Sequence, residues 1–547
     1  MAKAKAKKPV KKVAAKAKKP AGKKPVPKKK ASPKKKPALK KQPVPKRKPA
    51  PKKTPAVRKS AAPAKKAKEQ DPTKPTFTWS TRDDLAQKWN ELGRAHFTRY
   101  SEQLAKLYAG EHVEIDGKDP RSEADGDAVV EHVIALNKTG EGERVRELFD
   151  PAHTPLMGWI KSNEAQLGNV AMMGADDILV RQGSPWQHDG ATYYLHGSTA
   201  TVMPDMLGFR RSRNRDHIVV ARGDGLYFYD AREGVAGLGR APRAKLAWPA
   251  MSSLEPAGMN AEQKAEWAEN QDDDKRLLVE HLRISDDGMR VVMTAYRQGI
   301  LLASLHPGHA PWTLVYPNLS EPWTKPGSGY TRAGDMTHAD ISRDGTRLAF
   351  GSQDSPHFAA TINDRGEVEH YATIGNLSEY PHDACFSDSG KSVTFNSCHF
   401  YNGATILFQW DGNQGKELDA YEQHPEAPCI DGNLRVYASC FLPADLASAI
   451  INEPTDRGAF LLAGSGIMRI ISGAKGMVSV QGFGSSASAV DYDPEEKRLV
   501  LSSYSGYVHV YDLSQAEEPG RIDGVNARKE TARWALWPRL PNGPVRW

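Results

Sequence analysis

One sequence pattern recurs in the middle of this chain and constrains its fold more than any other feature. The stretch HLRISDDGMRVVMTA (281–295) returns position for position, at an offset of 57 residues, as HADISRDGTRLAFGS (338–352). A looser copy, HDACFSDSGKSVTFNS (382–397), follows about 44 residues later. Each copy reads as a short apolar strand, a Ser-x-(Asp/Ser)-Gly turn and a second strand of alternating apolar residues. This is the pattern of a β-hairpin.

The turn of each copy has the residue types that a tight hairpin requires. A Ser or Asp side chain can accept hydrogen bonds from backbone N–H groups in the turn, and Gly288, Gly345 and Gly390 can adopt positive φ. A single hairpin unit cannot bury both of its faces, so units that recur along a chain stack against one another. The repeat therefore predicts an all-β chain folded as a β-propeller.

Further copies follow the same layout of charged turn, apolar strand, Gly turn and aromatic strand that ends in Tyr-Asp. They are RNRDHIVVARGDGLYFYD (213–230) and EEKRLVLSSYSGYVHVYD (495–512), and one Trp-Asp pair stands at 410–411. Here the chain resembles the WD-repeat β-propellers, and ISRDGTRLAFGSQD (341–354) is the nearest match to their blade pattern. The Gly-His pair that precedes the first strand in that family is missing. The resemblance implies the fold and no particular function.

The strand pattern predicts about seven four-stranded blades between residues 155 and 515. A short helical segment is expected at 76–150, since apolar residues recur there at spacings of three and four after a Ser-x-x-Asp start. A C-terminal extension, 516–547, carries three tryptophans in its last 14 residues. We expect those rings to pack against the propeller or the helical segment, although they could instead form a partner site.

Charge divides the chain into two bodies of opposite sign. Through Pro75 the sequence has 30 Lys and Arg against 2 Asp and Glu, a net charge of +28. The remaining 46 basic and 64 acidic residues give the rest of the chain a net charge of −18. Residues 1–75 consist almost entirely of Lys, Pro and Ala, so they have too little apolar surface to offset their ordering entropy. We expect a disordered basic tail.

The tail resembles the tails of linker histones, and its Ser-Pro-Lys-Lys run matches an element of theirs. Lysines that neutralise phosphates release condensed counterions, so we expect binding to nucleic acid or another polyanion without sequence preference. No aromatic residues interleave the lysines, and base stacking is therefore not predicted. A solubilising tail, or a tail that folds back on the acidic body, is the alternative. The predicted contact residues are Lys28, Lys29, Lys30, Ser32, Pro33, Lys34, Lys35, Lys36, Lys46, Arg47 and Lys48.

Candidate sites on the propeller lie where the innermost strands begin, at the mouth of the central channel. By analogy with WD-repeat blades, these positions hold histidines and aspartates that could bind a divalent metal or act as acid and base. The favoured interpretation is that each hydrogen-bonds within its own blade, and no HExxH, GxSxG, phosphate-loop or dinucleotide motif indicates catalysis. The residues are His281, Asp335, His338, Asp340, His382 and Asp383.

One basic cluster interrupts the acidic body, with arginines at 210, 211, 213 and 215. It could contact a phosphate or a protein partner, but a solvated hairpin turn is the favoured interpretation. The four cysteines have neither metal-ligand spacing nor the density of a disulfide framework. No secretory h-region and no run of about 18 apolar residues occurs. We therefore expect an intracellular protein without a membrane contact.

Three classes of function remain open, and the sequence favours a non-catalytic protein over an enzyme. The preferred one is a propeller scaffold that binds an unidentified protein partner and is tethered to nucleic acid by its tail. The alternatives are a metal-dependent enzyme or ligand binder with a His/Asp site at the channel mouth, and an interaction platform that its own tail inhibits. We predict no cofactor. The expected location is cytoplasmic and nucleoid-associated in a bacterium, or nuclear in a eukaryote.

Overall fold

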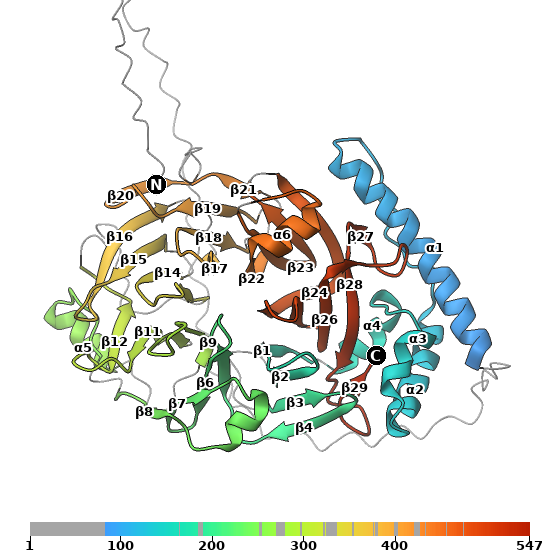
Figure 1. Ribbon diagram of the computed structural model, residues 1–547, viewed down its shortest axis with the longest axis horizontal. Helices are drawn as coiled ribbons and strands as arrows, with labels where there is room; N and C mark the ends of the chain where they lie inside the picture. The colour runs from blue at the N-terminus through green and yellow to red at the C-terminus, as the bar shows by residue number, and fades with distance from the viewer. Residues whose placement is uncertain are drawn as a thin grey trace, which may run out of the picture. The chain divides into compact units, whose positions relative to one another are not determined.

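The computed structural model (Figure 1) describes residues 82–163, 165–183, 190–250, 254–269, 279–295, 298–320, 323, 336–352, 355–375, 377, 381–398, 403–420, 427–432, 434–455, 457–473 and 475–547. Within them, helices come first and antiparallel sheets follow. The predicted tail, 1–75, lies outside the described residues. So does the sequence that joins it to the first helix.

The described strands form six sheets, and in all but two of them the strands are consecutive along the chain. The first three sheets are β1 (Leu167–Met172), β2 (Asp177–Gln182), β3 (Thr192–His196) and β4 (Thr199–Met203); β5 (Gly208–Arg211), β6 (His217–Arg222), β7 (Gly225–Asp230) and β8 (Ala244–Ala247); and β9 (Val279–Ile284), β10 (Arg290–Ala295), β11 (Gly299–Ser304) and β12 (Trp312–Tyr316).

The next two sheets are β13 (His338–Ile341), β14 (Arg347–Gly351), β15 (His357–Ile362) and β16 (Val368–Gly375), with β20 (Lys416–Asp419) added at the edge; and β17 (Pro381–Phe386), β18 (Ser392–Ser397), β19 (Thr405–Gln409) and β21 (Cys429–Asp431). The β20 strand pairs in parallel with β16, although it follows β19 along the chain. One sheet therefore has five strands, where four were predicted.

The last sheet has eight strands among the described residues, seven of them in one path and β27 paired with β24 beside it. It contains β22 (Val436–Leu442), β23 (Ala459–Ser472), β24 (Gly476–Asp493), β25 (Arg498–Ser503), β26 (Tyr507–Ala516), β27 (Gly524–Val525), β28 (Arg528–Ala535) and β29 (Val545–Arg546). Strands β28 and β29 lie in the segment that the sequence assigned to an extension beyond residue 515. The alternation of apolar and polar residues that indicates a strand is weaker there, because β28 is buried on both faces in its second half.

The sheets stand side by side around a common axis (Figure 1). The first strands contact one another in order, from β1 to β5, β9, β13, β17, β22 and β24, and β24 and β25 pack back against β1. Buried side chains from Leu167 and Val170 of β1 and from Val500 and Val508 of the last sheet fill the final junction. This closed circuit of antiparallel sheets is a β-propeller, as the repeat predicted.

The repeated turns have the predicted geometry. Gly288, Gly345 and Gly390 adopt φ of 66°, 71° and 66°. In the first turn the hydroxyl of Ser285 accepts from the Arg290 N–H at 3.0 Å, and the second and third copies make the same bond from Ser342 and Ser387. The three hairpins therefore share the same turn hydrogen bond as well as the same sequence pattern.

Arginines connect each of these turns to the preceding sheet. The guanidinium of Arg243 donates to the Gly288 carbonyl at 2.6 Å, that of Arg290 to Gly345 at 2.7 Å, and that of Arg347 to Gly390 at 2.6 Å. Each bond joins neighbouring sheets at the same point of the repeat. Charge-assisted bonds of this kind are stronger than neutral ones. They fix the spacing between successive sheets.

Helices precede the propeller, as predicted, and interrupt it twice. The four that precede it are α1 (Arg82–Tyr108), α2 (Glu123–Lys138), α3 (Val145–Leu148) and α4 (Met157–Asn163), with the short 3-10 turns Gly142–Arg144 and Thr154–Leu156 between them. Later come the 3-10 turn Gly234–Gly239, α5 (Ala261–Glu269) and α6 (Ala444–Ile451). No described helix is long and apolar enough to cross a membrane.

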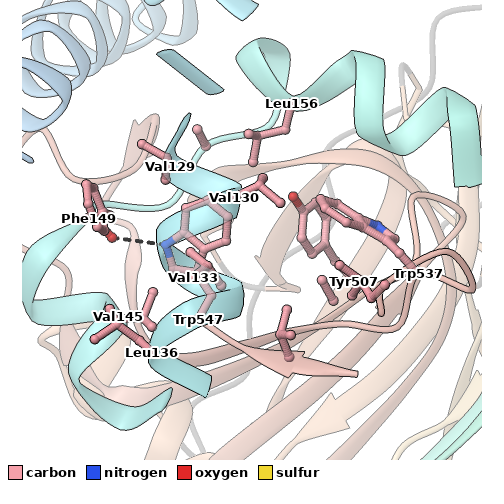
Figure 2. Close-up of a cluster of buried hydrophobic side chains, with 14 of the residues drawn as sticks. Val129, Val130, Val133, Leu136, Val145, Phe149, Leu156, Tyr507, Trp537 and Trp547 are labelled. Atoms are coloured by element: carbon pink, nitrogen blue, oxygen red, sulfur yellow. Dashed lines mark hydrogen bonds between the residues drawn. The ribbon is translucent and has the colours of Figure 1, made fainter. Parts of the chain in front are cut away.

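The preceding helices share one hydrophobic core with the C-terminal residues (Figure 2). Trp547 is 2% exposed and its indole N–H donates to the Phe149 carbonyl at 3.0 Å. Trp537 packs in the same core and donates to the Ser505 carbonyl at 2.9 Å. The aromatic C-terminus is thus packed against the helices and the last sheet, as expected. Because the helices also adjoin β1 in sequence, this core joins the first and last sheets.

Candidate functional site at the channel

The innermost strands place alternate side chains on the central channel. In β9, Leu282 and Ile284 are buried between sheets, so His281 and Arg283 project from the opposite face. The 57-residue offset carries this pattern to His338 and Asp340 of β13. In β9 and β13 the histidine therefore stands nearer the start of the strand than the charged residue, whereas in β17 Asp383 directly follows His382.

The histidines form a buried neutral group. The Nε2 atom of His338 lies 3.0 Å from Nδ1 of His357. His357 belongs to β15, which is separated from β13 by β14 in the same sheet, and the sequence analysis did not single it out. Burial lowers the pKa of His281 to about 3 and that of His382 to about 4, and holds the pKa of His338 well below its ordinary value. These rings are uncharged at neutral pH. They can donate or accept one hydrogen bond per nitrogen but attract no anion.

Asp340 serves a structural role at the other end of the channel. Its Oδ2 atom accepts from the Arg213 guanidinium at 2.6 Å and from the Phe386 backbone N–H at 2.7 Å. The carboxylate therefore connects β13 to two other segments, the turn after β5 and the end of β17. Its hydrogen bonds extend beyond its own blade, whereas the sequence favoured bonds within the blade.

Asp383 is also buried, but in a more neutral setting. It accepts hydrogen bonds from the Ser439 hydroxyl and, at 3.0 Å, from the Asn396 amide. Its nearest guanidinium is that of Arg283, whose Nη2 atom lies 3.9 Å from Oδ1. Burial outweighs these partners and raises the pKa of Asp383 to about 7. About half of this carboxyl group is therefore protonated at neutral pH.

A third carboxylate, Asp491 of β24, completes the charged end. It accepts from Arg215 Nη1 at 3.0 Å and from the Met172 backbone N–H at 2.9 Å. Burial alone would raise the pKa of Asp491, but the guanidiniums of Arg215 and Arg210 outweigh it and lower this pKa. The sequence analysis missed Asp491, because only the closed ring of sheets brings it within reach of Arg210 and Arg215.

A cavity of about 250 Å³ opens among these charged groups. Six arginines and four carboxylates line it, together with two free cysteines and small polar side chains. The charged lining residues are Arg210, Arg211, Arg213, Arg215, Arg283, Arg343, Asp340, Asp388, Asp491 and Glu495.

The basic cluster at 210–215 is not the solvated hairpin turn that the sequence favoured. Arg211 and Arg215 are 7% and 4% exposed, and Arg211 donates to the backbone carbonyls of Arg215, Met172 and Ala231. Arginine spacing along a turn cannot distinguish solvated from buried side chains, because their acceptors come from distant parts of the chain. The clustering itself was the signal for this charged end.

Asp335, one of the predicted channel residues, and all eleven predicted tail contacts lie outside the described residues. Across the described part of the chain, no group of three or more His, Cys, Asp or Glu residues is arranged to hold a metal ion. His338 and His357 touch, but no further ligand joins them there.

No protein-family model and no curated protein sequence matches the chain. Among solved structures, it is similar to KlHsv2 with loop 6CD replaced by a Gly-Ser linker, at 9% identity and a TM-score of 0.35, over 68% of this chain and 98% of that one. It is also similar to Sqt1 of Saccharomyces cerevisiae, at 10% identity and a TM-score of 0.36, over 57% of this chain and 72% of that one.

Proposed function

We propose that this protein is a non-catalytic interaction scaffold, a seven-bladed propeller that its basic N-terminal segment tethers to nucleic acid. In this proposal the eight-stranded sheet counts as two blades. Strand β24 pairs with β23 up to Ser486 and with β25 from Ala487 onward, so it changes blades at that point. The propeller offers its surface to a protein partner, and the tail determines where the complex resides.

The observation that carries the proposal is the division of charge. A net +28 within 75 residues is concentrated enough to engage several phosphates at once, while the net −18 of the remaining chain repels a polyanion. Nucleic acid would therefore meet the tail and avoid the body. The location that follows is the nucleoid of a bacterium or the chromatin of a eukaryote.

The channel supports a scaffold role because two of its buried carboxylates connect different sheets. Asp340 and Asp491 are each bonded to an arginine and to a backbone N–H, and both bonds join different sheets. Breaking one member of a buried pair is costly, so such groups stabilise one arrangement of the blades. Of the polar residues that the sequence placed at the channel, Asp340 is used in this way.

The test compares the full chain with a variant that lacks residues 2–75. Binding to duplex DNA, RNA and polyphosphate is measured at several salt concentrations. The full chain should bind all three with steep salt dependence, and the truncated protein should lose most of this affinity while its thermal unfolding stays unchanged. Equal, weak binding by both forms would refute the tether and leave the tail as an intramolecular or solubilising segment.

A charge-matched pair of variants separates charge from sequence. Replacing the lysines of 28–36 and 46–48 by arginine should preserve most of the affinity, because it preserves the charge that releases counterions. Replacing the same lysines by glutamine should lower the affinity and flatten the salt dependence. If both variants bound like the full chain, these two clusters would not be the contact.

A further inference from the structure

Two arginines at the charged end of the channel are less well bonded than their neighbours. Arg210 of β5 and Arg283 of β9 come from adjacent innermost strands and line the same cavity. Their side chains are 14% and 18% exposed, so each is largely buried yet open to the cavity. Buried guanidiniums normally have acceptors for most of their five N–H donors.

The hydrogen bonds of this pair are few. Arg210 Nη1 donates to the Val490 carbonyl at 2.9 Å, and its nearest carboxylate oxygen, on Asp491, is 3.6 Å away. Arg283 Nη1 donates to the carbonyl of its own neighbour Leu282 at 3.1 Å. Its contacts with Asp340 and Asp383 are 3.6 and 3.9 Å, beyond hydrogen-bond distance.

The carboxylates near the pair are bound more tightly by other groups. Asp340 is 2.6 Å from Arg213, Asp491 is 3.0 Å from Arg215, and Asp383 is held by Ser439 and Asn396. These bonds are all made by the Oδ2 atoms of the three carboxylates. Their Oδ1 atoms face the pair, at 3.6 Å and 3.9 Å from Arg283 and 3.6 Å from Arg210. The two guanidiniums therefore retain N–H donors that no carboxylate of the cavity satisfies at hydrogen-bond distance.

The lining of the cavity contains six arginines and four carboxylates. Two of these arginines, Arg215 and Arg343, also pair with carboxylates outside the lining, those of Asp493 and Asp286. Two neighbouring positive side chains repel each other in a buried site unless an anion lies between them. The planar N–H fork of arginine matches carboxylate and phosphate oxygens in a bidentate manner.

From these observations we infer that the charged end of the channel is an oxyanion site, in which Arg210 and Arg283 together hold one carboxylate or phosphate group. The cavity, about 250 Å³, is large enough for such a group and the small molecule that carries it. Arg213 and Arg215 bind the Oδ2 atoms of Asp340 and Asp491, whose Oδ1 atoms stay 3.6 Å from the pair, beyond hydrogen-bond distance. This site is independent of the proposed tether, since no tail residue contributes to the argument.

Arginine-specific labelling of the full chain tests the site directly. Phenylglyoxal modifies arginines, and the tail is almost entirely lysine, with arginine only at 47 and 58. Modification of each arginine is followed by mass spectrometry with increasing citrate or inorganic phosphate at constant ionic strength. The site predicts saturable protection of Arg210 and Arg283, with no protection of Arg365, which is 78% exposed.

The two probes distinguish the sources of the oxyanion. Protection by citrate alone would assign the site to carboxylates, and protection by phosphate alone would assign it to phosphates. Protection by both would show that the site accepts either group. Absent protection at millimolar concentrations, or equal protection of Arg365, would overturn the inference.

Conservative variants keep the test independent of folding. Arg210→Lys and Arg283→Lys retain the charge but lose the planar fork, so calorimetric affinity for the protecting probe should fall about ten-fold in each. Arg365→Lys is the matched control and should leave that affinity unchanged. Unaltered affinity in both cavity variants, with circular dichroism matching the parent protein, would also overturn the inference.

Discussion

Replacing Trp547 by alanine tests whether the helices and the C-terminal residues form one core with the propeller. The side chain is 2% exposed and packs among Val129, Val133 and Phe149 (Figure 2). Removing a buried tryptophan side chain costs about 3–5 kcal/mol. The substitution also leaves the Phe149 carbonyl without its indole donor, which adds about 1 kcal/mol. We therefore expect a loss of about 4–6 kcal/mol in the free energy of unfolding.

This loss is measured by denaturant unfolding, with the circular dichroism of the backbone as the signal. Val202→Ala is the control, because Val202 is 55% exposed and its truncation should change stability by less than about 0.5 kcal/mol. Trp547→Phe should cost less than Trp547→Ala, since it keeps much of the apolar contact. A loss below about 1 kcal/mol in Trp547→Ala would refute the shared core.

Three further predictions concern the blades and the channel. Gly345→Ala should destabilise the protein by about 1–2 kcal/mol in thermal unfolding, because the residue adopts φ of 71° and the new methyl group would lie 3.1 Å from the Ser285 Cβ. Gly158→Ala is the control: this glycine lies in a helix with open space around it, so the substitution should not destabilise the protein in that assay. Arg347→Ala should cost about 1–3 kcal/mol in denaturant unfolding, since it removes the bond to the Gly390 carbonyl and the guanidinium above the Trp410 ring. Burial raises the pKa of Asp383 to about 7, so the folded protein holds this proton more tightly than the unfolded chain does. The free energy of unfolding should therefore fall, at this site, as pH rises from about 4 to about 7, and Asp383→Asn should remove that fall in a pH series of unfolding curves.

The repeat was sufficient to predict the propeller, because its turns depend on residues close together in sequence. Ser285, Gly288 and their equivalents form bonds within five residues, and such bonds leave a clear pattern. The parallel addition of β20 and the continuation of the last sheet through β28 were not predicted. Both depend on pairing between strands distant in sequence or buried on two sides, for which alternation gives no signal.

The channel was only partly predictable for the same reason. The offset between repeats placed His338 at the position of His281 and Asp340 at that of Arg283, and the structure brings them to the channel. It could not show that Asp340 would bond to Arg213, or that Asp491 would lie beside Arg210 and Arg215. These partners are more than 100 residues apart in sequence, and only closure of the ring brings them together.

The tether rests on the tail, and the salt dependence of DNA binding is its most direct test. If the tail engages about ten phosphates, a plot of log affinity against log salt concentration should have a slope near −9 for the full chain on duplex DNA. The variant lacking residues 2–75 should show a slope near zero. Equal slopes for the two proteins would contradict the account, because they would place the contact with DNA outside the tail.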